Sequence, residues 1–351
     1  MADDVLIYGS YGYTGELIAK QAAASSDLDP TVAGRNAEKV RSQASRLGLE
    51  GAVFSLSGGD DVASEIGDFD VVLNCAGPFS RTAEPMVDAC IETGTHYLDI
   101  TGEWQVFDAL AQRSEEAADA GVMLLPGTGF DVVPSDCLAA HLVDRLPDAE
   151  SITLALGGMG GLSRGTAMTM VEGFGDDGVV RENGELKRVP QAFDDREFEF
   201  SHGTRSAMTI PWGDVVTAYH STGVGNVRVY SETHPDTISR LRTFRKLAPL
   251  VQTGPVQSLL KWLVDRRIDG PDDEQLREGS GEIYGEAENA AGERVVSHLE
   301  TPNAYALTRD TALLCVRRVL DGDAPTGYQT PSTAYGKDLV LEVDGVERID
   351  D

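Results

Sequence analysis

The stretch VLIYGSYGYTGELIAK, residues 5–20, joins a short apolar run to a glycine-rich loop and the start of a helix-forming segment. The run DVLIY has the composition of a buried strand, and residues 14–26 have that of a helix. Gly9, Gly12 and Gly15 give the spacing G-x-x-G-x-x-G between them. After the first strand of an α/β domain, such a loop favours phosphate binding at a helix N-terminus. We therefore expect these residues to open a dinucleotide-binding domain.

Each residue of the loop has an expected role. Gly9 allows the tight turn, Gly12 leaves room for a pyrophosphate, and Gly15 lets helix and strand pack closely. Thr14 is suited to begin the helix. The aromatic residues of the loop, Tyr11 and Tyr13, are expected either to cover the cofactor or to pack beneath the next loop.

Strands and helices alternate after this loop. The spacing predicts a Rossmann-type doubly wound parallel sheet, whose ligands lie beyond the carboxyl ends of the strands. A single helix is expected from Trp104 to Ala120. The other expected strands are residues 30–34, 51–56, 69–77, 95–100 and 121–127, and the other expected helices are residues 35–48, 60–68 and 82–94.

The end of the second strand bears on which dinucleotide binds. NAD-specific domains usually carry an acidic residue there, which holds the ribose 2′-hydroxyl. This sequence has AGRN instead, so Arg35 is suited to a 2′-phosphate, and Ser10 or Asn36 is placed to add hydrogen bonds. A solvated arginine at a helix start is the alternative for Arg35.

The charge balance excludes one class of partner. The chain has 58 acidic and 29 basic residues, a net charge of −29, and only six lysines. Such a surface repels phosphate backbones, so we expect no nucleic-acid partner. An acidic, lysine-poor composition resembles that of proteins from salt-in halophiles, and we expect an acidic surface and loss of structure in dilute buffer.

Metal binding and membrane insertion are not indicated. The four cysteines form no C-x-x-C pair, so we expect reduced thiols and no metal site. No apolar segment is long enough to span a bilayer, and the first residues lack the features of a secretory signal. We expect a cytoplasmic protein.

Several motifs together resemble one family. The segments GSYGYTG, AGRN, VVLNCAGPFSRTAEPMVDACIETGTHYLDITGE and PGTGFDVVPSD resemble those of the saccharopine dehydrogenase-like oxidoreductases, a group that includes trans-acting enoyl reductases. The later segments SRGTAMTMVE, TPNAYALTRDTALL and GYQTPSTAYG extend the resemblance over nearly the whole chain. The resemblance implies an NADP(H)-binding Rossmann domain at residues 1–127, a central α+β substrate domain at 128–301, and a segment at 302–351 that returns to the first domain.

The resemblance also implies site residues. The residues expected at the cofactor are Gly9, Ser10, Tyr11, Gly12, Tyr13, Thr14, Gly15, Arg35, Asn36, Cys75, Ala76, Gly77, Pro78 and Phe79. We favour a packing role for Cys75, because no histidine lies near it in the sequence to activate a nucleophile.

Acid–base and substrate residues are expected near the mouth of the same site. A hydride added to carbon leaves an enolate or alkoxide, which a positioned acid can protonate. Capping helices or ordering loops is the alternative role for these side chains. The catalytic candidates are Tyr97, Asp99 and Asp131, and the substrate candidates are Glu103, Ser163, Arg164 and Thr166.

Residues 240–267 reverse the acidic trend of the chain, with seven basic residues and one acidic residue. Apolar residues at helical spacing predict two basic amphipathic helices within 238–268, separated by Gly254 and Pro255. Such helices suit peripheral contact with an anionic membrane or the mouth of a lipid site. Packing on the substrate domain is the alternative, and we favour it.

The sequence therefore favours an NADP(H)-dependent reductase of an activated C=C or C=N bond, with a small molecule or a lipid as substrate. An extended short-chain dehydrogenase is disfavoured, because no tyrosine is followed by lysine four residues later. An accessory or sensor protein that binds NADP(H) without turnover remains the alternative. A homodimer is left open.

Overall fold

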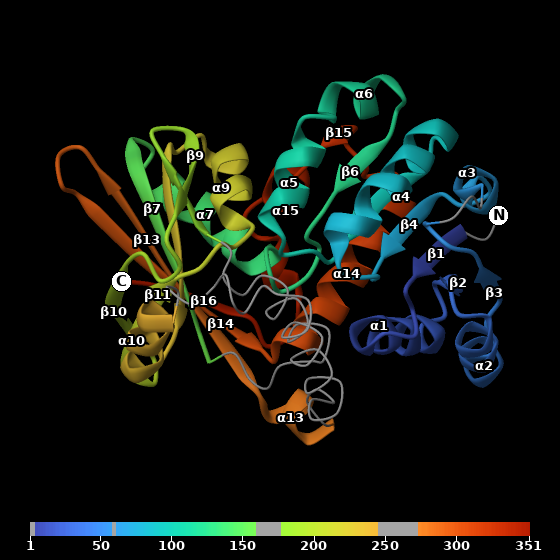
Figure 1. Ribbon diagram of the computed structural model, residues 1–351, viewed down its shortest axis with the longest axis horizontal. Coiled ribbons are helices and arrows are strands. Elements are labelled where there is room, and N and C mark those ends of the chain that lie inside the picture. The colour runs from blue at the N-terminus through green and yellow to red at the C-terminus, as the bar shows by residue number, and fades with distance from the viewer. Residues whose placement is uncertain (1–3, 58–60, 159–176, 245–272) are drawn as a thin grey trace. The chain divides into compact units, whose positions relative to one another are not determined.

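The computed structural model describes residues 4–57, 61–158, 177–244 and 273–351 (Figure 1). The chain divides into two compact units. The first comprises residues 1–133 and 305–335, and the second comprises residues 134–304 and 336–351.

The first unit contains a seven-stranded sheet in the order β15-β6-β5-β4-β1-β2-β3. All six pairings between these strands are parallel, which confirms the predicted doubly wound sheet. The strands are β1 (Asp4–Tyr8), β2 (Asp29–Gly34), β3 (Gly51–Val53), β4 (Val71–Asn74), β5 (His96–Asp99), β6 (Met123–Leu125) and β15 (Gly327–Tyr328).

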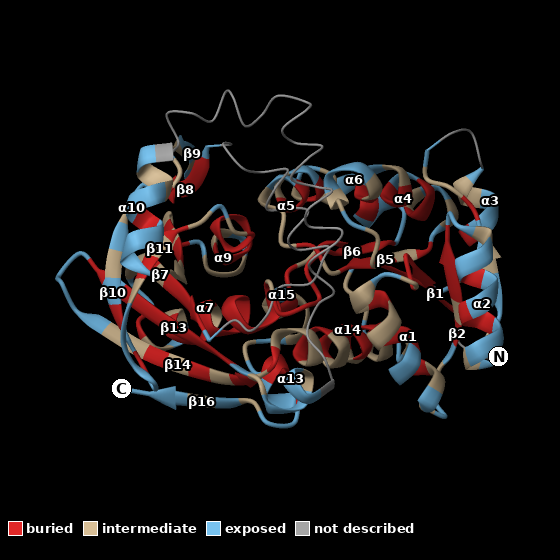
Figure 2. Cartoon of the chain, turned by 60° about the horizontal axis from the view of Figure 1, so that its bottom comes forward, coloured by how far each residue is buried: buried red, intermediate tan, exposed pale blue. Residues whose placement is uncertain are grey.

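Helices cover both faces of this sheet, as Figure 1 shows. One face carries α1, α2 and α14, and the other carries α3 to α6. The central strands are buried from both sides, because Val5, Leu6 and Ile7 expose 1% of their surface or less (Figure 2). The helices are α1 (Tyr13–Ala24), α2 (Ala37–Leu47), α3 (Val62–Ile66), α4 (Phe79–Thr93), α5 (Trp104–Ala111), α6 (Ser114–Asp119), α14 (Ala304–Leu320) and α15 (Pro331–Tyr335).

The single helix expected from Trp104 to Ala120 is wrong, because α5 ends at Ala111 and α6 begins at Ser114. The reason is a contact with a distant segment. The Ser114 hydroxyl accepts a hydrogen bond from the Tyr328 amide of β15 at 3.0 Å. The second half of the segment is therefore placed by β15, a strand more than 200 residues later.

The second unit contains a nine-stranded mixed sheet, with the path β10-β11-β12-β7-β13-β14-β16 and the hairpin β8-β9 attached to β12. Its strands are β7 (Ala149–Gly157), β8 (Gly178–Glu182), β9 (Glu185–Val189), β10 (Asp195–Phe200), β11 (Gly203–Thr209), β12 (Asn226–Glu232), β13 (Ser280–Asn289), β14 (Arg294–Pro302) and β16 (Glu347–Asp350). Its helices are α7 (Val133–Arg145), α9 (Asp214–Thr222), α10 (Pro235–Phe244), α13 (Asp273–Glu278) and the 3-10 helix η2 (Leu339–Glu342).

Strand β13 shows how this sheet is packed. Gly285 faces α7, where an added Cβ would lie 2.8 Å from side-chain atoms of Leu138 and Leu142. The next residue back, Tyr284, faces the opposite side and packs against Phe198 at a ring-centroid distance of 5.2 Å. The alternation of side chains along a strand thus gives each face of the sheet its own core.

The C-terminal segment differs from the expectation that residues 302–351 return to the first domain. Residues 305–335 belong to the first unit, but residues 336–351 belong to the second. The physical reason is strand pairing, because β16 adds to the edge of the second sheet against β14. The first unit likewise continues beyond residue 127, to Val133.

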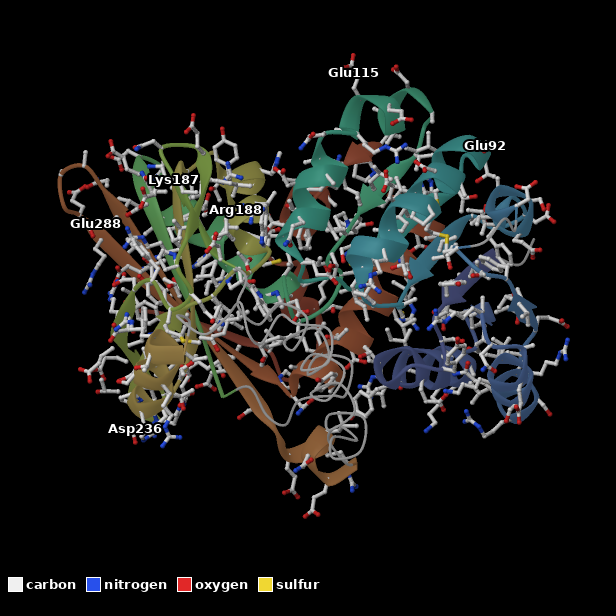
Figure 3. The ribbon with its side chains drawn as sticks, in the orientation of Figure 1. Glu92, Glu115, Lys187, Arg188, Asp236 and Glu288 are labelled. Atoms are coloured by element: carbon white, nitrogen blue, oxygen red, sulfur yellow. The ribbon has the colours of Figure 1, made fainter. Side chains whose placement is uncertain are left out.

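Many acidic side chains point to solvent in both units. Figure 3 shows Glu92, Glu115, Asp236 and Glu288 extending away from their elements, and all four are exposed. Among the described residues, no helix is long and apolar enough to cross a membrane.

Candidate dinucleotide-binding site

The glycine loop connects β1 to α1 through a backbone that requires glycine at two positions. Gly9 has a φ of +78°, and a Cβ there would lie 2.7 Å from the Ala76 backbone nitrogen. A Cβ on Gly15 would lie 2.6 Å from the Gly9 carbonyl oxygen. The turn at Gly9 and the close packing at Gly15 match the roles predicted for these residues.

The N-terminus of α1 has the features that an anion requires. Helix α1 begins at Tyr13, and the N-cap residue Gly12 makes no side-chain cap hydrogen bond. Gly12 is exposed, and a Cβ there would meet only the Gly9 oxygen, at 3.3 Å. Thr14 therefore lies within the first turn and does not cap the helix, which corrects the expected helix start. An uncapped helix start behind an exposed glycine fits a bound pyrophosphate.

The two tyrosines of the loop pack on neighbouring elements. The Tyr11 hydroxyl accepts a hydrogen bond from the Asn36 amide at 3.3 Å, and its ring lies against Gly34. The Tyr13 ring meets Tyr305 of α14 edge to face, with 5.1 Å between centroids. Of the two roles expected for them, packing is the one that these contacts describe.

The end of β2 presents two cationic side chains. Arg35 is exposed and makes no hydrogen bond or ion pair with any described residue. Lys39 is also exposed, and its Nζ lies 5.4 Å from the centroid of the Tyr11 ring. The Asn36 side chain caps α2, because its Oδ1 accepts from the Lys39 amide at 3.0 Å. Two exposed cationic residues thus follow β2, the strand after which a ribose 2′-substituent is expected.

Ser10 does not lie at the surface with Arg35 and Lys39. It is fully buried, and its hydroxyl donates to Oε1 of Gln43 at 2.6 Å. The expectation that Ser10 contacts a 2′-phosphate is therefore wrong in this arrangement, because the hydroxyl faces α2 from beneath the loop.

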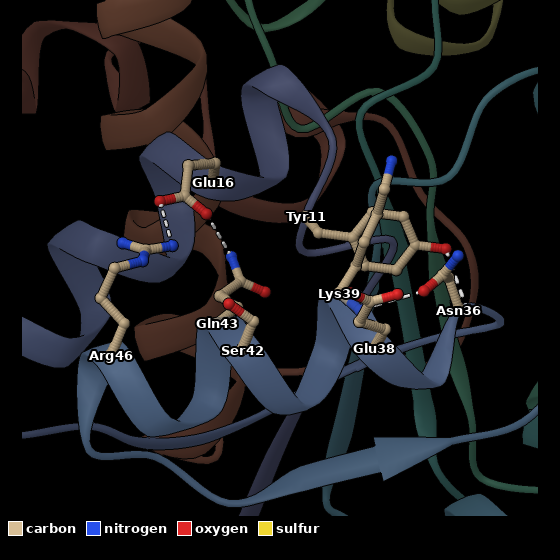
Figure 4. A pocket seen from close by; sticks show the side chains of 8 residues that line it. All are labelled: Tyr11, Glu16, Asn36, Glu38, Lys39, Ser42, Gln43 and Arg46. Atoms are coloured by element: carbon tan, nitrogen blue, oxygen red, sulfur yellow. Dashed lines mark hydrogen bonds and ion pairs between the residues drawn. The ribbon is translucent and has the colours of Figure 1, made fainter.

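A pocket of about 430 Å³ opens beside these residues (Figure 4). It receives side chains from the glycine loop, from α1 and from α2. Within the pocket, the Glu16 carboxylate pairs with Arg46 at 2.7 Å. The Lys39 ammonium group lies beside the Tyr11 ring instead. The lining residues are Tyr11, Glu16, Asn36, Glu38, Lys39, Ser42, Gln43 and Arg46.

The ends of β4 and β5 form a closed polar network. Asn74, Tyr97 and Asp99 each have no exposed surface. The Tyr97 hydroxyl donates to Asp99 Oδ2 at 2.7 Å, and Asp99 Oδ1 accepts from the amides of Thr101 and Gly127, both at 2.9 Å. Burial raises the pKa of Asp99 to about 6.

This network changes the roles expected for Tyr97 and Asp99. The structure brings the two candidates together, but it uses their polar atoms to fix the loops that follow β5 and β6. Neither side chain reaches the surface of the site, so the loop-ordering alternative describes them and a direct catalytic contact does not.

The Glu103 side chain also makes hydrogen bonds within the protein. Its carboxylate accepts hydrogen bonds from the amides of Phe79, at 2.7 Å, and Ser80, at 2.9 Å. These are the first amides of α4, so Glu103 caps that helix. The expected substrate contact of Glu103 is therefore corrected to a helix cap supplied by the loop after β5.

The segment between β4 and α4 packs against the glycine loop. Ala76 is the residue that approaches Gly9, and the Gly77–Pro78 peptide that follows is cis. Cys75 is half-buried, its amide donates to the Tyr8 carbonyl at 2.7 Å, and burial raises the pKa of its thiol. A raised pKa disfavours the thiolate, in agreement with a packing role.

Asp131 is the catalytic candidate whose side chain is half-buried. Its carboxyl group packs against Gly102 in the loop after β5, where an added Cβ would lie 2.9 Å from Asp131 Oδ2. Burial raises the pKa of Asp131 to about 7, so the group changes protonation near neutral pH.

The structure does not test the remaining candidates. Ser163, Arg164 and Thr166 fall outside the described residues. Within the described ranges, no group of three or more His, Cys, Asp or Glu side chains is arranged to hold a metal ion.

The sequence of the first unit matches a known family. Residues 5–125 fit the model of the saccharopine dehydrogenase NADP-binding domain. The match therefore lies within the first unit. The glycine loop, the uncapped α1 and the exposed Gly12 suit the nicotinamide dinucleotide that the name of this domain implies.

Part of the sequence is similar to that of curated proteins. A human saccharopine dehydrogenase-like oxidoreductase is 32% identical over 220 residues, which cover 53% of this chain and 50% of the relative. A trans-acting enoyl reductase from Mycobacterium leprae is 33% identical over 150 residues, which cover 41% of this chain and 36% of the relative. The chain thus spans half or less of the length of these relatives.

Solved structures share the whole fold. Apo saccharopine dehydrogenase (L-Glu forming) from Saccharomyces cerevisiae aligns over 100% of both chains, with a TM-score of 0.68 and 13% identity. Homospermidine synthase from Legionella pneumophila, in complex with NAD, aligns with 100% of this chain and 92% of its own, with a TM-score of 0.65 and 11% identity. At these identities, both likenesses concern the fold alone.

Two residues at this site, Lys39 and Gln43, are not among those expected from the sequence. Lys39 follows the cap residue Asn36 by three positions, and residues three apart lie on the same face of a helix, so this spacing could have indicated Lys39. Gln43 had no such signal, because a single amide within an amphipathic helix is usually solvated.

Proposed function

We propose that the protein is an NADP(H)-dependent oxidoreductase that transfers hydride to an activated carbon–carbon or carbon–nitrogen double bond. The observation that carries the preference for NADP(H) is the pair of exposed cations that follow β2, Arg35 directly after the strand and Lys39 in the first turn of α2. A 2′-phosphate placed between them forms charge-assisted hydrogen bonds that a 2′-hydroxyl cannot match. The names of the relatives, an oxidoreductase and an enoyl reductase, support the reaction class.

Asp131 is the proposed proton donor. Hydride addition to carbon leaves an enolate or an amide anion, which needs a proton from the protein or from water. A carboxyl group with a pKa of about 7 is still protonated in a large fraction of molecules at neutral pH. The burial that raises the pKa of Asp131 thereby fits it for this step, whereas Tyr97 and Asp99 are enclosed.

An enoyl lipid is the first substrate class to test, because enoyl reductases occur among the relatives. The proposed membrane contact through residues 240–267 falls largely on residues outside the described ranges. In the described part, the Arg242 guanidinium donates to the Ala192 carbonyl at 2.9 Å and pairs with Asp195 at 2.6 Å. These contacts support packing of α10 on its own unit over membrane contact by Arg242.

A second candidate function is an accessory protein that binds NADP(H) without turnover. The enclosure of Tyr97 and Asp99 favours it, because two of the three acid–base candidates are used structurally. Oxidation of NADPH in the presence of an enoyl thioester or an amino-acid imine would exclude this candidate.

The test is a titration with NADPH and with NADH in concentrated KCl, followed by nicotinamide fluorescence. We expect tighter binding of NADPH, and a loss of about 10- to 100-fold for NADPH alone in Arg35→Ala and in Lys39→Ala, as expected when one charge-assisted contact is removed. Arg41→Ala is the matched control, because Arg41 is an exposed arginine of α2, the helix that carries Lys39.

Binding of neither nucleotide by the parent protein would overturn the proposed function. Equal binding of both nucleotides, unchanged in Arg35→Ala, would overturn the preference for NADP(H) and leave the family match of residues 5–125 intact.

A further inference from the structure

Gln43 is a buried amide on α2 that makes hydrogen bonds with both ends of its side chain. It exposes 2% of its surface. Its Oε1 accepts from the Ser10 hydroxyl at 2.6 Å, and its Nε2 donates to the Ser10 carbonyl at 2.8 Å. Nε2 also donates to Glu16 Oε2 at 2.6 Å. One side chain thus joins the glycine loop, α1 and α2.

The Glu16 carboxylate contacts both Gln43 and Arg46, as Figure 4 shows. The other oxygen of Glu16 accepts from Arg46 at 2.7 Å, one helical turn after Gln43. The carboxylate of Glu16 therefore has a partner for each oxygen, and it holds the Gln43 amide in one orientation. An amide fixed from three sides presents its carbonyl and its NH₂ group to Ser10 without rotating.

The loop depends on this amide because of its own geometry. Ser10 is fully buried directly after Gly9, whose positive φ turns the chain. Without Gln43, the Ser10 carbonyl would lose a partner in a place that water does not reach. A buried polar group left unpaired is costly, so the loop would shift toward solvent. Such a shift would move Gly12 and the first amides of α1, the groups expected to meet the pyrophosphate.

We infer that Gln43 is a positioning residue that holds the glycine loop in its phosphate-binding conformation. The inference rests on the proposed function in that the loop binds a dinucleotide. It assigns separate tasks to two turns of α2. Asn36, the N-cap, and Lys39, in the first turn, are expected beside the 2′-position, whereas Gln43, in the next turn, acts only through the loop. Its effect is therefore the same for NADPH and NADH.

The test compares Gln43→Met with the parent protein and with Gln21→Met. Methionine keeps the length of glutamine and removes its hydrogen bonds. Gln21 is an exposed glutamine of α1, so its replacement is the same chemical change away from the loop. We expect the Kd values for NADPH and NADH to rise by the same factor, about tenfold or more, in Gln43→Met alone. If the parent protein binds both nucleotides, a change for NADPH only, or for neither, would overturn the inference.

Hydrogen exchange of the ligand-free protein gives a readout that does not depend on binding. We expect faster amide exchange in residues 9–12 of Gln43→Met, with the exchange of β4 and β5 unchanged. Unchanged exchange in residues 9–12 would overturn the inference even if the parent protein binds NADPH. Faster exchange in a protein that binds neither nucleotide would uphold the role of Gln43 in the loop and overturn the proposed function alone.

Discussion

Two parts of the same parallel sheet edge differ in how they use their polar groups. At the ends of β1 and β2, which we call the open end, Gly12, Arg35 and Lys39 are exposed. At the ends of β4 and β5, the closed end, Asn74 and Asp99 have no exposed surface and bond within the protein. Polar residues after buried strands look alike in sequence. Burial decides whether they build the loops or remain available to a ligand.

The largest effect is expected from Asp131, which lies beside the closed end. Asp131→Asn should lower kcat for NADPH-dependent reduction of an enoyl thioester by about 10²- to 10⁴-fold, because asparagine cannot donate the proton as an acid does. In the parent protein, kcat should fall as the pH rises through about 7. Asp119→Asn, an exposed aspartate of α6, is the control. Unchanged kcat in Asp131→Asn would mean that Asp131, like Asp99, has only a structural role.

The same variant should change how stability depends on pH. The folded-state pKa of Asp131 lies above the ordinary value of 3.8, so the folded protein holds this proton more tightly than the unfolded chain does. Its contribution to stability is therefore lost as the pH rises from 3.8 to about 7. Urea unfolding at pH 5 and pH 8 should show a smaller pH dependence in Asp131→Asn. An identical pH dependence in both proteins would contradict the raised pKa.

The next effect concerns the loop at the open end. Gly9→Ala should weaken binding of NADPH by about 100-fold or more, because its Cβ would overlap the Ala76 backbone and force the loop to move. Gly48→Ala is a matched control. Gly48 also has a positive φ, of +72°, but its Cβ would meet nothing within 4 Å. Equal affinity in the two variants, measured by fluorescence titration, would show that the close approach at Gly9 is unimportant for binding.

A smaller effect, on stability, is expected at the closed end. Tyr97→Phe should lower the free energy of unfolding by about 1–3 kcal/mol, because Asp99 loses a buried hydrogen-bond donor. Affinity for NADPH should stay unchanged. Tyr335→Phe removes a hydroxyl whose acceptor is the Met123 sulfur, at 3.8 Å, and should cost less. A loss of affinity in Tyr97→Phe without a loss of stability would end the contrast between the two strand ends.

The smallest effect tests the packing of Tyr11. Tyr11→Phe keeps the ring against Gly34 and removes the acceptor of the Asn36 amide. Since one weak hydrogen bond is lost, NADPH affinity should fall only about two- to fivefold. A loss as large as that of Arg35→Ala would mean that the hydroxyl contacts the cofactor itself.

The open end was largely predictable from sequence, and the closed end was not. The roles of Gly9 and Gly15 follow from residue type and spacing, because a positive φ and a close approach of helix to strand both require glycine. The role of Arg35 at a 2′-phosphate stays a prediction. The enclosure of Tyr97 depends on Asn74, and the use of Glu103 depends on the start of α4, so these fates follow from contacts between separate strands and helices. The burial of Ser10 beneath Gln43 likewise follows from tertiary packing, which residue type does not reveal.

The path of the chain between the two units has a consequence for protein engineering. The first unit is interrupted after Val133 and resumes at Tyr305, and the chain then leaves it again after Tyr335. Neither unit is therefore one continuous stretch that a single pair of cut sites could release. A fragment ending at residue 125, where the family match ends, would keep the glycine loop but lose β15 and α14. Exchanging cofactor domains between relatives would accordingly require transplanting two separate segments together.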